Sequence, residues 1–198
     1  SGLIDRPEVS HLRLATHLLT ALLIFGFTLW VAFDLKTLAR DAAARPASMP
    51  VLGAWTLAVL FVQFLFGAYV AGLEAGYAFN TWPLMGDEFF PTATPMLEPW
   101  ARNFVDNPIM VQFVHRWVAL MVLGVAGLLA LRAWQRGLKA EAMLVVLATV
   151  FQILLGIATL VTGVALWLGV AHQGMAALLL GAILICCHAM ARQQAARP

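Results

Sequence analysis

Five long apolar segments with few charged residues dominate this chain of 198 residues. They lie at about 11–33, 51–72, 108–131, 141–163 and 168–190. Each is close to or above the ~20 residues with which an α-helix crosses ~30 Å of hydrocarbon. The apolar runs are continuous rather than alternating, which favours helices over the strands of a membrane barrel. We therefore predict an all-α, polytopic membrane bundle of five transmembrane helices, the last four of which form a four-helix bundle.

The composition excludes a soluble domain. Hydrophobic residues make up 62% of the chain and charged residues 11%, against roughly 25% charged in soluble domains. The sequence has no phosphate-binding loop, Ser-His-Asp set, metalloprotease motif or basic patch. We expect membrane lipid as a partner and no nucleic acid.

The charges in the loops predict an orientation. Lysine and arginine gather in the 34–50 and 132–141 loops and in the C-terminal tail, whereas the 73–107 loop has one cation against five acidic residues. Positive loops stay in the cytoplasm. We predict a multi-pass protein of the bacterial inner membrane, with the N-terminus of this chain and the 73–107 loop outside and the C-terminus in the cytoplasm.

Three histidines lie at similar depths in the outer halves of three apolar segments: His17, His115 and His172. A titratable ring is costly inside a membrane, so its presence suggests a function. Imidazole is a common axial ligand of haem iron, and helical bundles hold cofactors between facing helices. We predict that His115 and His172 bind one haem iron, which makes the last four helices a haem-binding bundle. The alternative is that each ring only hydrogen-bonds a neighbouring helix. A zinc or copper site would need further carboxylate or thiolate ligands, which these depths do not offer.

Arg116 follows His115 directly and has two interpretations. Its guanidinium could bind a haem propionate, or it could extend to the lipid headgroups. The aromatic 73–107 loop also has two interpretations. It could form an aromatic belt at the headgroups, or it could be a lid over a site. Small residues are expected to leave room for a flat macrocycle: Gly124, Gly127, Gly174, Ala176 and Ala177.

The segments repeat in pairs. A segment carrying Gln63-x-x-x-Gly67 precedes the segment of His115, and one carrying Gln152-x-x-x-Gly156 precedes that of His172. Such internal repeats are common in membrane proteins. We interpret the glutamines and glycines as helix-packing residues.

The first histidine segment has no such partner before it. The chain opens with Ser1-Gly2-Leu3, which matches the small-Gly-aliphatic ends of the Gln/Gly segments. We expect the chain to be part of a longer protein. We assign 1–50 to a His-bearing helix and cytoplasmic linker left over from an N-terminal half, and 51–198 to a haem half with the 73–107 loop.

Smaller signals concern helix ends and lone residues. Ser10 and Asn107 are expected to cap helices, with Pro108 at a first helical position. The adjacent Cys186 and Cys187 are interpreted as apolar filler. His11 and His188 are expected to be structural or solvated.

Several motifs together resemble the haem A synthase family. They are Arg102-Asn103-Phe104 with Asn107 and MVQFVHR at 110–116, the opening SGL with RLATHL at 13–18, AYVAGLEAG at 68–76 with NTWPLMG at 80–86, and Ala171-His172-Gln173. The resemblance covers nearly the whole chain. It implies an eight-helix protein in two halves, of which this chain would supply the fourth to eighth helices.

The resemblance also implies an activity. The family oxidises a methyl group of haem O to the formyl group of haem A, for cytochrome oxidase. Its C-terminal half binds a haem b through the histidines that match His115 and His172, and its N-terminal half holds the substrate haem through a ligand that matches His17. The second substrate-side histidine and an acidic residue near it have no match in this chain. We therefore expect that this chain alone does not catalyse the reaction.

The implied partners are haem O, an electron donor of unidentified kind, and haem O synthase or cytochrome oxidase assembly factors. A homo-oligomer is left open. Two other functions are considered, a b-type cytochrome anchor for quinol-linked electron transfer and a non-redox membrane scaffold.

Overall fold

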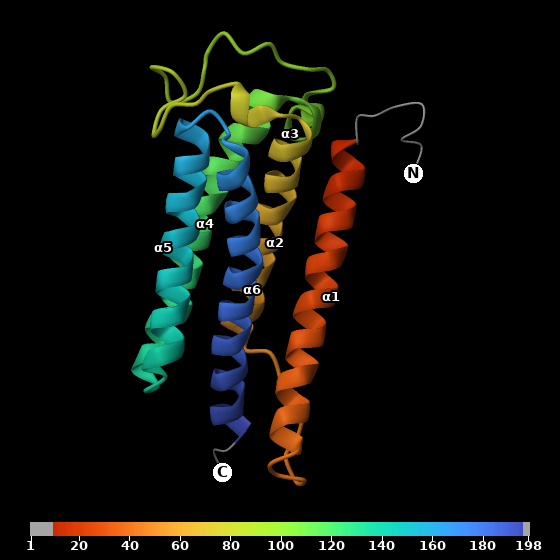
Figure 1. Ribbon diagram of the computed structural model, residues 1–198, viewed down its shortest axis with the longest axis vertical. Helices are drawn as coiled ribbons and strands as arrows, with labels where there is room; N and C mark the ends of the chain where they lie inside the picture. The colour runs from red at the N-terminus through yellow and green to blue at the C-terminus, as the bar shows by residue number, and fades with distance from the viewer. Residues whose placement is uncertain (1–9, 196–198) are drawn as a thin grey trace.

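The computed structural model describes residues 10–195 and confirms the five predicted helices (Figure 1). They are α1 (His11–Leu38), α2 (Val51–Gly72), α4 (Pro108–Gln135), α5 (Lys139–Val161) and α6 (Leu166–Ala195). Each is long and apolar enough to cross a membrane. The opening Ser1-Gly2-Leu3 and the last three residues lie outside the described part of the chain.

Helix ends show where the sequence signals worked and where they failed. Asn107 caps α4 as predicted, since its side-chain oxygen accepts hydrogen bonds from the backbone nitrogens of Ile109 (3.1 Å) and Met110 (3.4 Å), with Pro108 first in the helix. Ser10 takes the N-cap position of α1, but its side chain makes no capping hydrogen bond, so that part of the prediction is wrong. Helices α1 and α6 continue several residues past their apolar segments, because a helix can extend into water beyond the hydrocarbon.

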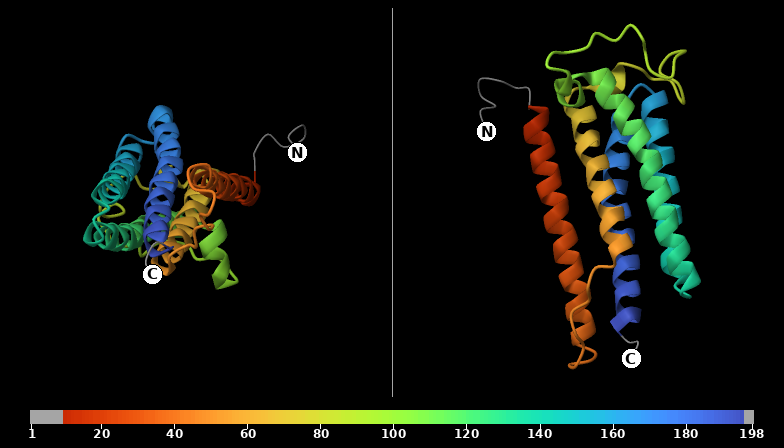
Figure 2. Two further views of the ribbon diagram at one scale, coloured as in Figure 1. Left: turned by 90° about the horizontal axis from the view of Figure 1, so that it is seen from below. Right: turned by 180° about the vertical axis from the view of Figure 1, so that it is seen from behind.

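The helices alternate in direction, so the bundle has two distinct ends (Figure 1). The loop end carries the start of α1 and the 73–107 segment, and the tail end carries the last turn of α6. Helix α2 packs mainly on α4, and α5 on α6. Seen along the bundle in Figure 2, α1 stands beside the other four helices, where it contacts α2 and α6.

The core lies around the half of α6 nearest the tail end. Twelve residues of α6 are buried, whereas α1 buries only Ala15 and Leu22. Cys186 and Cys187 are free and fully buried, as expected for filler. Helix α1 is therefore a peripheral element.

The 73–107 segment has structure of its own. It contains two short 3₁₀ turns, η1 (Ala75–Tyr77) and η2 (Trp100–Arg102), and the one-turn helix α3 (Asn103–Asp106). Asn103 is fully buried and organises the second part. Its amide donates to the carbonyls of Leu97 (3.0 Å) and Trp100 (2.7 Å), and its oxygen accepts from the Leu97 nitrogen (2.9 Å).

Candidate functional site

Two imidazoles occupy equivalent positions in the two helix pairs of the bundle. His115 on α4 faces Gln63 of α2, with 3.4 Å between the amide nitrogen and Nε2. His172 on α6 faces Gln152 of α5, with 3.5 Å between the same two kinds of atom. Each ring nitrogen can accept a weak hydrogen bond from the amide in one tautomer. The repeat seen in the sequence is thus a repeat in side-chain geometry.

A glycine makes room for each ring. A Cβ atom added at Gly67 would lie 3.1 Å from Cε1 of His115, and one added at Gly156 would lie 2.9 Å from Cε1 of His172. Any larger residue would push the ring out of its position. The glycines were predicted to let helices pack closely, and the side chains that approach them from the facing helices are the two histidines.

The glycines chosen from the sequence do not contact the rings, and their role of leaving room for a macrocycle stays a prediction. A Cβ atom added at Gly124, Gly127 or Gly174 would meet no atom within 4 Å. The glutamines and glycines that do contact the rings were recognised as a repeat but not as part of the site. Their signal was present, since each pair stands on the helix that precedes a histidine helix.

Both rings keep a polar atom without a partner. Nδ1 of His115 and of His172 is buried and makes no hydrogen bond, and the same is true of Oε1 of Gln63 and Gln152. An unsatisfied buried polar atom costs roughly 1–3 kcal/mol. Two equivalent buried rings, each with a nitrogen that makes no hydrogen bond, fit a site that binds a metal-bearing group.

Arg116 is directed at the 73–107 segment. Its Nη1 donates to the carbonyls of Thr81 (2.8 Å) and Leu84 (3.2 Å), and its Nη2 donates to that of Phe79 (3.0 Å). The residue is only 7% exposed, so the alternative in which it extends to the headgroups is wrong. Its Nε is buried without a partner. Neither sequence interpretation included this anchoring role.

The anchored segment covers the loop end of α4. Gln112, one turn before Arg116, donates to the same Phe79 carbonyl at 2.8 Å. Further along the loop, the ring of Phe89 packs on Trp117 of α4, with 4.8 Å between centroids. Other aromatic side chains of the loop stay exposed, among them Tyr77, Trp82 and Trp100. The segment therefore covers the loop end of α4 and also presents an exposed aromatic surface, and its roles as a belt at the headgroups or a lid over a site stay predictions.

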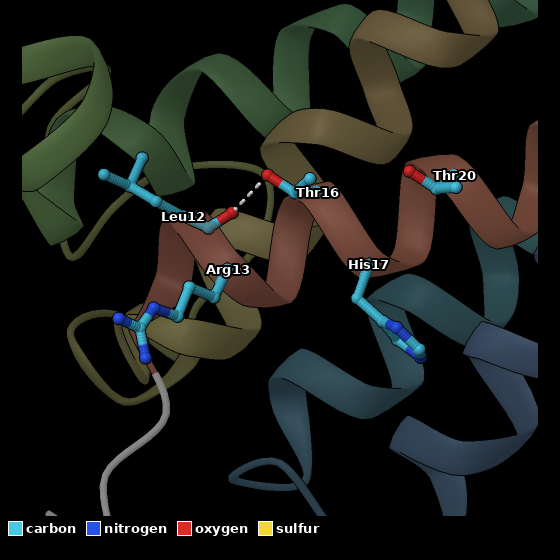
Figure 3. A pocket seen from close by; sticks show the side chains of 5 residues that line it. All are labelled: Leu12, Arg13, Thr16, His17 and Thr20. Atoms are coloured by element: carbon cyan, nitrogen blue, oxygen red, sulfur yellow. Dashed lines mark hydrogen bonds between the residues drawn. The ribbon is translucent and has the colours of Figure 1, made fainter. Parts of the chain in front are cut away.

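His17 lies apart, on an exposed face of α1. Figure 3 shows it beside an open hollow of about 420 Å³, lined by Leu12, Arg13, Thr16, His17 and Thr20. All five residues belong to α1 itself. That His17 belongs to a different site from the other two histidines stays a prediction.

The two remaining histidines each lie beside an aspartate. Nε2 of His188 hydrogen-bonds Oδ1 of Asp34 at 3.0 Å, and His188 is 8% exposed, so the structural of its two predicted roles is the one observed. Nε2 of His11 lies 3.3 Å from Oδ1 of Asp106. Within residues 10–195, no three histidine, cysteine or acidic side chains gather closely enough to bind a metal ion on their own.

Comparison with known proteins identifies the family. Residues 1–184 match the COX15-CtaA family, described as cytochrome oxidase assembly protein. The chain belongs to this family. It is similar to proteins named haem A synthase from Rhizorhabdus wittichii (50% identity over 96% of this chain), Sphingopyxis alaskensis (42% over 98%) and Flavobacterium psychrophilum (41% over 91%).

The chain spans 55% of the length of the first two of these relatives and 54% of the third. No solved structure matches it at a significant level. The family and the five apolar helices together make it a multi-pass membrane protein.

Proposed function

We propose that this chain is the haem b half of a membrane oxidoreductase that converts haem O to haem A by oxidising a ring methyl to a formyl group. The observation that carries the proposal is the pair of equivalent imidazoles. His115 and His172 come from two repeated helix pairs, each with a free buried nitrogen. Relatives named haem A synthase support the reaction.

In this proposal His115 and His172 would hold the iron of haem b. Haem b would supply one-electron redox chemistry when bound. Gln63 and Gln152 orient the rings through their amides, and Gly67 leaves space for one of them. Outer partners that orient a ligating imidazole are a general requirement of such sites.

Arg116 would act at the loop end of the same site. Its bonds to the carbonyls of Phe79, Thr81 and Leu84 hold the covering segment on α4. This cover would limit the access of water to the haem. The remaining Nε–H donor is free to bind a propionate, so the predicted contact with the haem stays part of the proposal.

His17 would be a ligand of the substrate haem. A polar, exposed face on a membrane helix requires a partner other than lipid, and the hollow beside His17 supplies such a face. The remainder of the substrate site would come from elements outside α1. The orientation with the loop end outside, an electron donor and contact with haem O synthase or assembly factors complete the proposal.

The test is a reduced-minus-oxidised visible spectrum of the membrane protein. We expect a low-spin b-type signal that disappears in His115→Ala and in His172→Ala and persists in the control His11→Ala. Supplying haem O and an oxidant to the full-length protein and looking for haem A then separates this function from a plain b-type cytochrome. A protein without any haem signal, or one in which both single variants keep it, would refute the proposal.

A further inference from the structure

Helix α1 is connected to the bundle by surprisingly little packing. It buries only Ala15 and Leu22. At its middle, α1 meets α6 only in ordinary van der Waals contact. A Cβ atom added at Gly26 would lie 3.5 Å from Cδ1 of Leu184. Lipid tails are as apolar as leucine, so apolar contacts in a membrane give a helix little preference for one position. Something else has to fix the rotation and height of α1.

At the tail end, α1 is joined to α6 by a histidine and an aspartate. Nε2 of His188 lies 3.0 Å from Oδ1 of Asp34, and Asp34 Oδ1 also accepts from the backbone nitrogen of Ala47 at 3.0 Å. The imidazole packs against two rings of α1, Trp30 at 5.2 Å and Phe33 at 5.4 Å between centroids. One contact therefore joins α1, α6 and the loop that follows α1.

At the loop end, a second pair joins α1 to the 73–107 segment. Nε2 of His11 lies 3.3 Å from Oδ1 of Asp106 on α3, without the geometry of a full hydrogen bond. Arg102 holds the other oxygen of the carboxylate at 3.0 Å. The His11 ring meets Tyr69 of α2 edge-on at 5.6 Å. At Gly72 the helices approach so closely that an added Cβ would lie 2.6 Å from the His11 Cα.

These two pairs stand at opposite ends of α1. His11 and Asp34 are 23 residues apart, or about 35 Å along a helix that rises 1.5 Å per residue. Polar contacts are directional, unlike apolar ones, and a helix held at both ends can neither slide nor turn freely. His17 lies between the two ends, about 1.7 helical turns from His11.

We infer that the pairs His188–Asp34 and His11–Asp106 are positioning contacts that hold α1, and with it His17, at a fixed place relative to His115 and His172. The positioning of α1 does not depend on the proposed function. Its consequence does, because a fixed α1 would keep a substrate haem at the correct distance from haem b. Within residues 10–195, none of the four paired residues forms a hydrogen bond or ion pair with His17, His115 or His172. They act through the helix that they hold.

The experiment measures the position of α1 directly. Spin labels are attached to cysteines at Phe27 on α1 and Leu178 on α6, which are 73% and 65% exposed, in protein in which Cys186 and Cys187 are replaced by alanine. The distance distribution is recorded by pulsed electron paramagnetic resonance, with any haem iron reduced. This readout needs neither substrate nor turnover, so it is independent of the proposed reaction.

The main variant is His188→Phe, which keeps the ring between Trp30 and Phe33 and removes the hydrogen bond. We expect the distribution to become broader, with other positions of α1 about threefold more populated, the scale of one interhelical hydrogen bond in a membrane. The matched control is Asp41→Leu, which removes an aspartate whose recorded side-chain bond is local, to Ala43. The variant His11→Phe, at the loop end, should broaden the distribution less than His188→Phe. The His11–Asp106 distance is 3.3 Å, against 3.0 Å for His188–Asp34.

The exchanged pair Asp34→His with His188→Asp is the rescue. It should restore the narrow distribution, whereas a merely structural defect would not be repaired by swapping the partners. If His188→Phe does not accumulate in membranes, recovery of accumulation in the exchanged protein supports the inference and its failure overturns it. A distribution in His188→Phe as narrow as in Asp41→Leu also overturns it. A full-length wild-type protein that forms no haem A contradicts the proposed function and not this inference, which is judged on the distance distribution.

Discussion

The surroundings of the histidines differ between the four-helix bundle (α2, α4, α5 and α6) and the peripheral helix α1. In the bundle, His115 and His172 each lie against a glutamine and a glycine from the preceding helix. On α1, His17 stands on an exposed face whose hollow is lined by α1 residues alone. Both kinds of site occur in apolar helices of similar length.

This difference shows what makes a histidine site self-contained. A site is complete within a chain when a neighbouring helix supplies both the space for the ring and a polar group to orient it. The repeated Gln-x-x-x-Gly pattern supplies both to the bundle, and no such helix precedes α1 within the described residues. We therefore expect the two regions to respond differently to substitution.

The largest expected effect is on the substrate side. In the full-length protein, His17→Ala should reduce haem A formation by about a hundredfold or more, the scale of removing a group that acts on the reacting centre, and should leave the b-type spectrum unchanged. The measurement is the haem composition of membranes by chromatography, together with the visible spectrum. Expression and helical content serve as controls, because a cavity can loosen a packed bundle. A well-folded His17→Ala protein without the b-type signal would contradict two separate sites.

The next effect concerns the glycines that admit the rings. Gly156→Val and Gly67→Val should each weaken haem b binding about tenfold, since overpacking costs roughly 1–3 kcal/mol. Gly156 should be the more sensitive, because its added Cβ would come closer to the ring, at 2.9 Å rather than 3.1 Å.

The matched control is Gly124→Val on α4, where an added Cβ meets no atom within 4 Å. Haem occupancy is measured by titrating the purified protein. Equal losses in Gly124→Val and Gly156→Val would show that the glycines matter for the helix in general and not for the imidazole.

Arg116→Leu should release the covering segment while the haem ligands remain in place. The substitution removes three hydrogen bonds to loop carbonyls, and bonds to a charged group contribute roughly 1.5–3 kcal/mol each. We expect faster hydrogen exchange in residues 79–84 and a retained b-type signal. Arg116→Lys should give an intermediate exchange rate, because an ammonium group cannot reproduce the planar fork. If the hydrogen-exchange rate of residues 79–84 were the same in Arg116→Leu as in the wild type, Arg116 would not anchor the loop.

The smallest perturbation tests the orientation that relates the two regions to the membrane. Asp87→Cys places a thiol at an exposed position of the 73–107 segment, with no expected effect on haem content. A membrane-impermeant maleimide should label it in intact cells, because the distribution of lysine and arginine predicts that the loop is outside. Labelling that requires cell lysis would reverse the orientation.

Much of the architecture could be read from the sequence because it depends on local properties. Hydrophobicity summed over ~20 residues identifies a membrane helix without knowledge of its neighbours, and all five helices were found in this way. The Asn107-Pro108 cap is equally local. The depth of His115 and His172 followed from counting residues from the helix starts.

Contacts between helices could not be read in the same way. Which face of a helix meets which neighbour depends on its rotation, and hydropathy does not distinguish a face towards lipid from a face towards another apolar helix. Thus Gln63 and Gly67 were recognised but assigned to packing, and the direction of Arg116 towards Phe79 was missed. The pair of His188 and Asp34 joins residues 154 positions apart, which no local pattern indicates.

The sequence by itself determined the number of membrane helices, the repeat and the depth of the three histidines, because these follow from the order and hydrophobicity of neighbouring residues. Only the tertiary structure decided that His115 and His172 each lie against a glycine, that Arg116 holds the loop and that α1 is joined to the bundle at both ends. Those arrangements depend on how whole helices rotate and approach each other. Apolar surfaces pack about equally well in many rotations, and a few buried polar atoms that need hydrogen-bond partners select one of them.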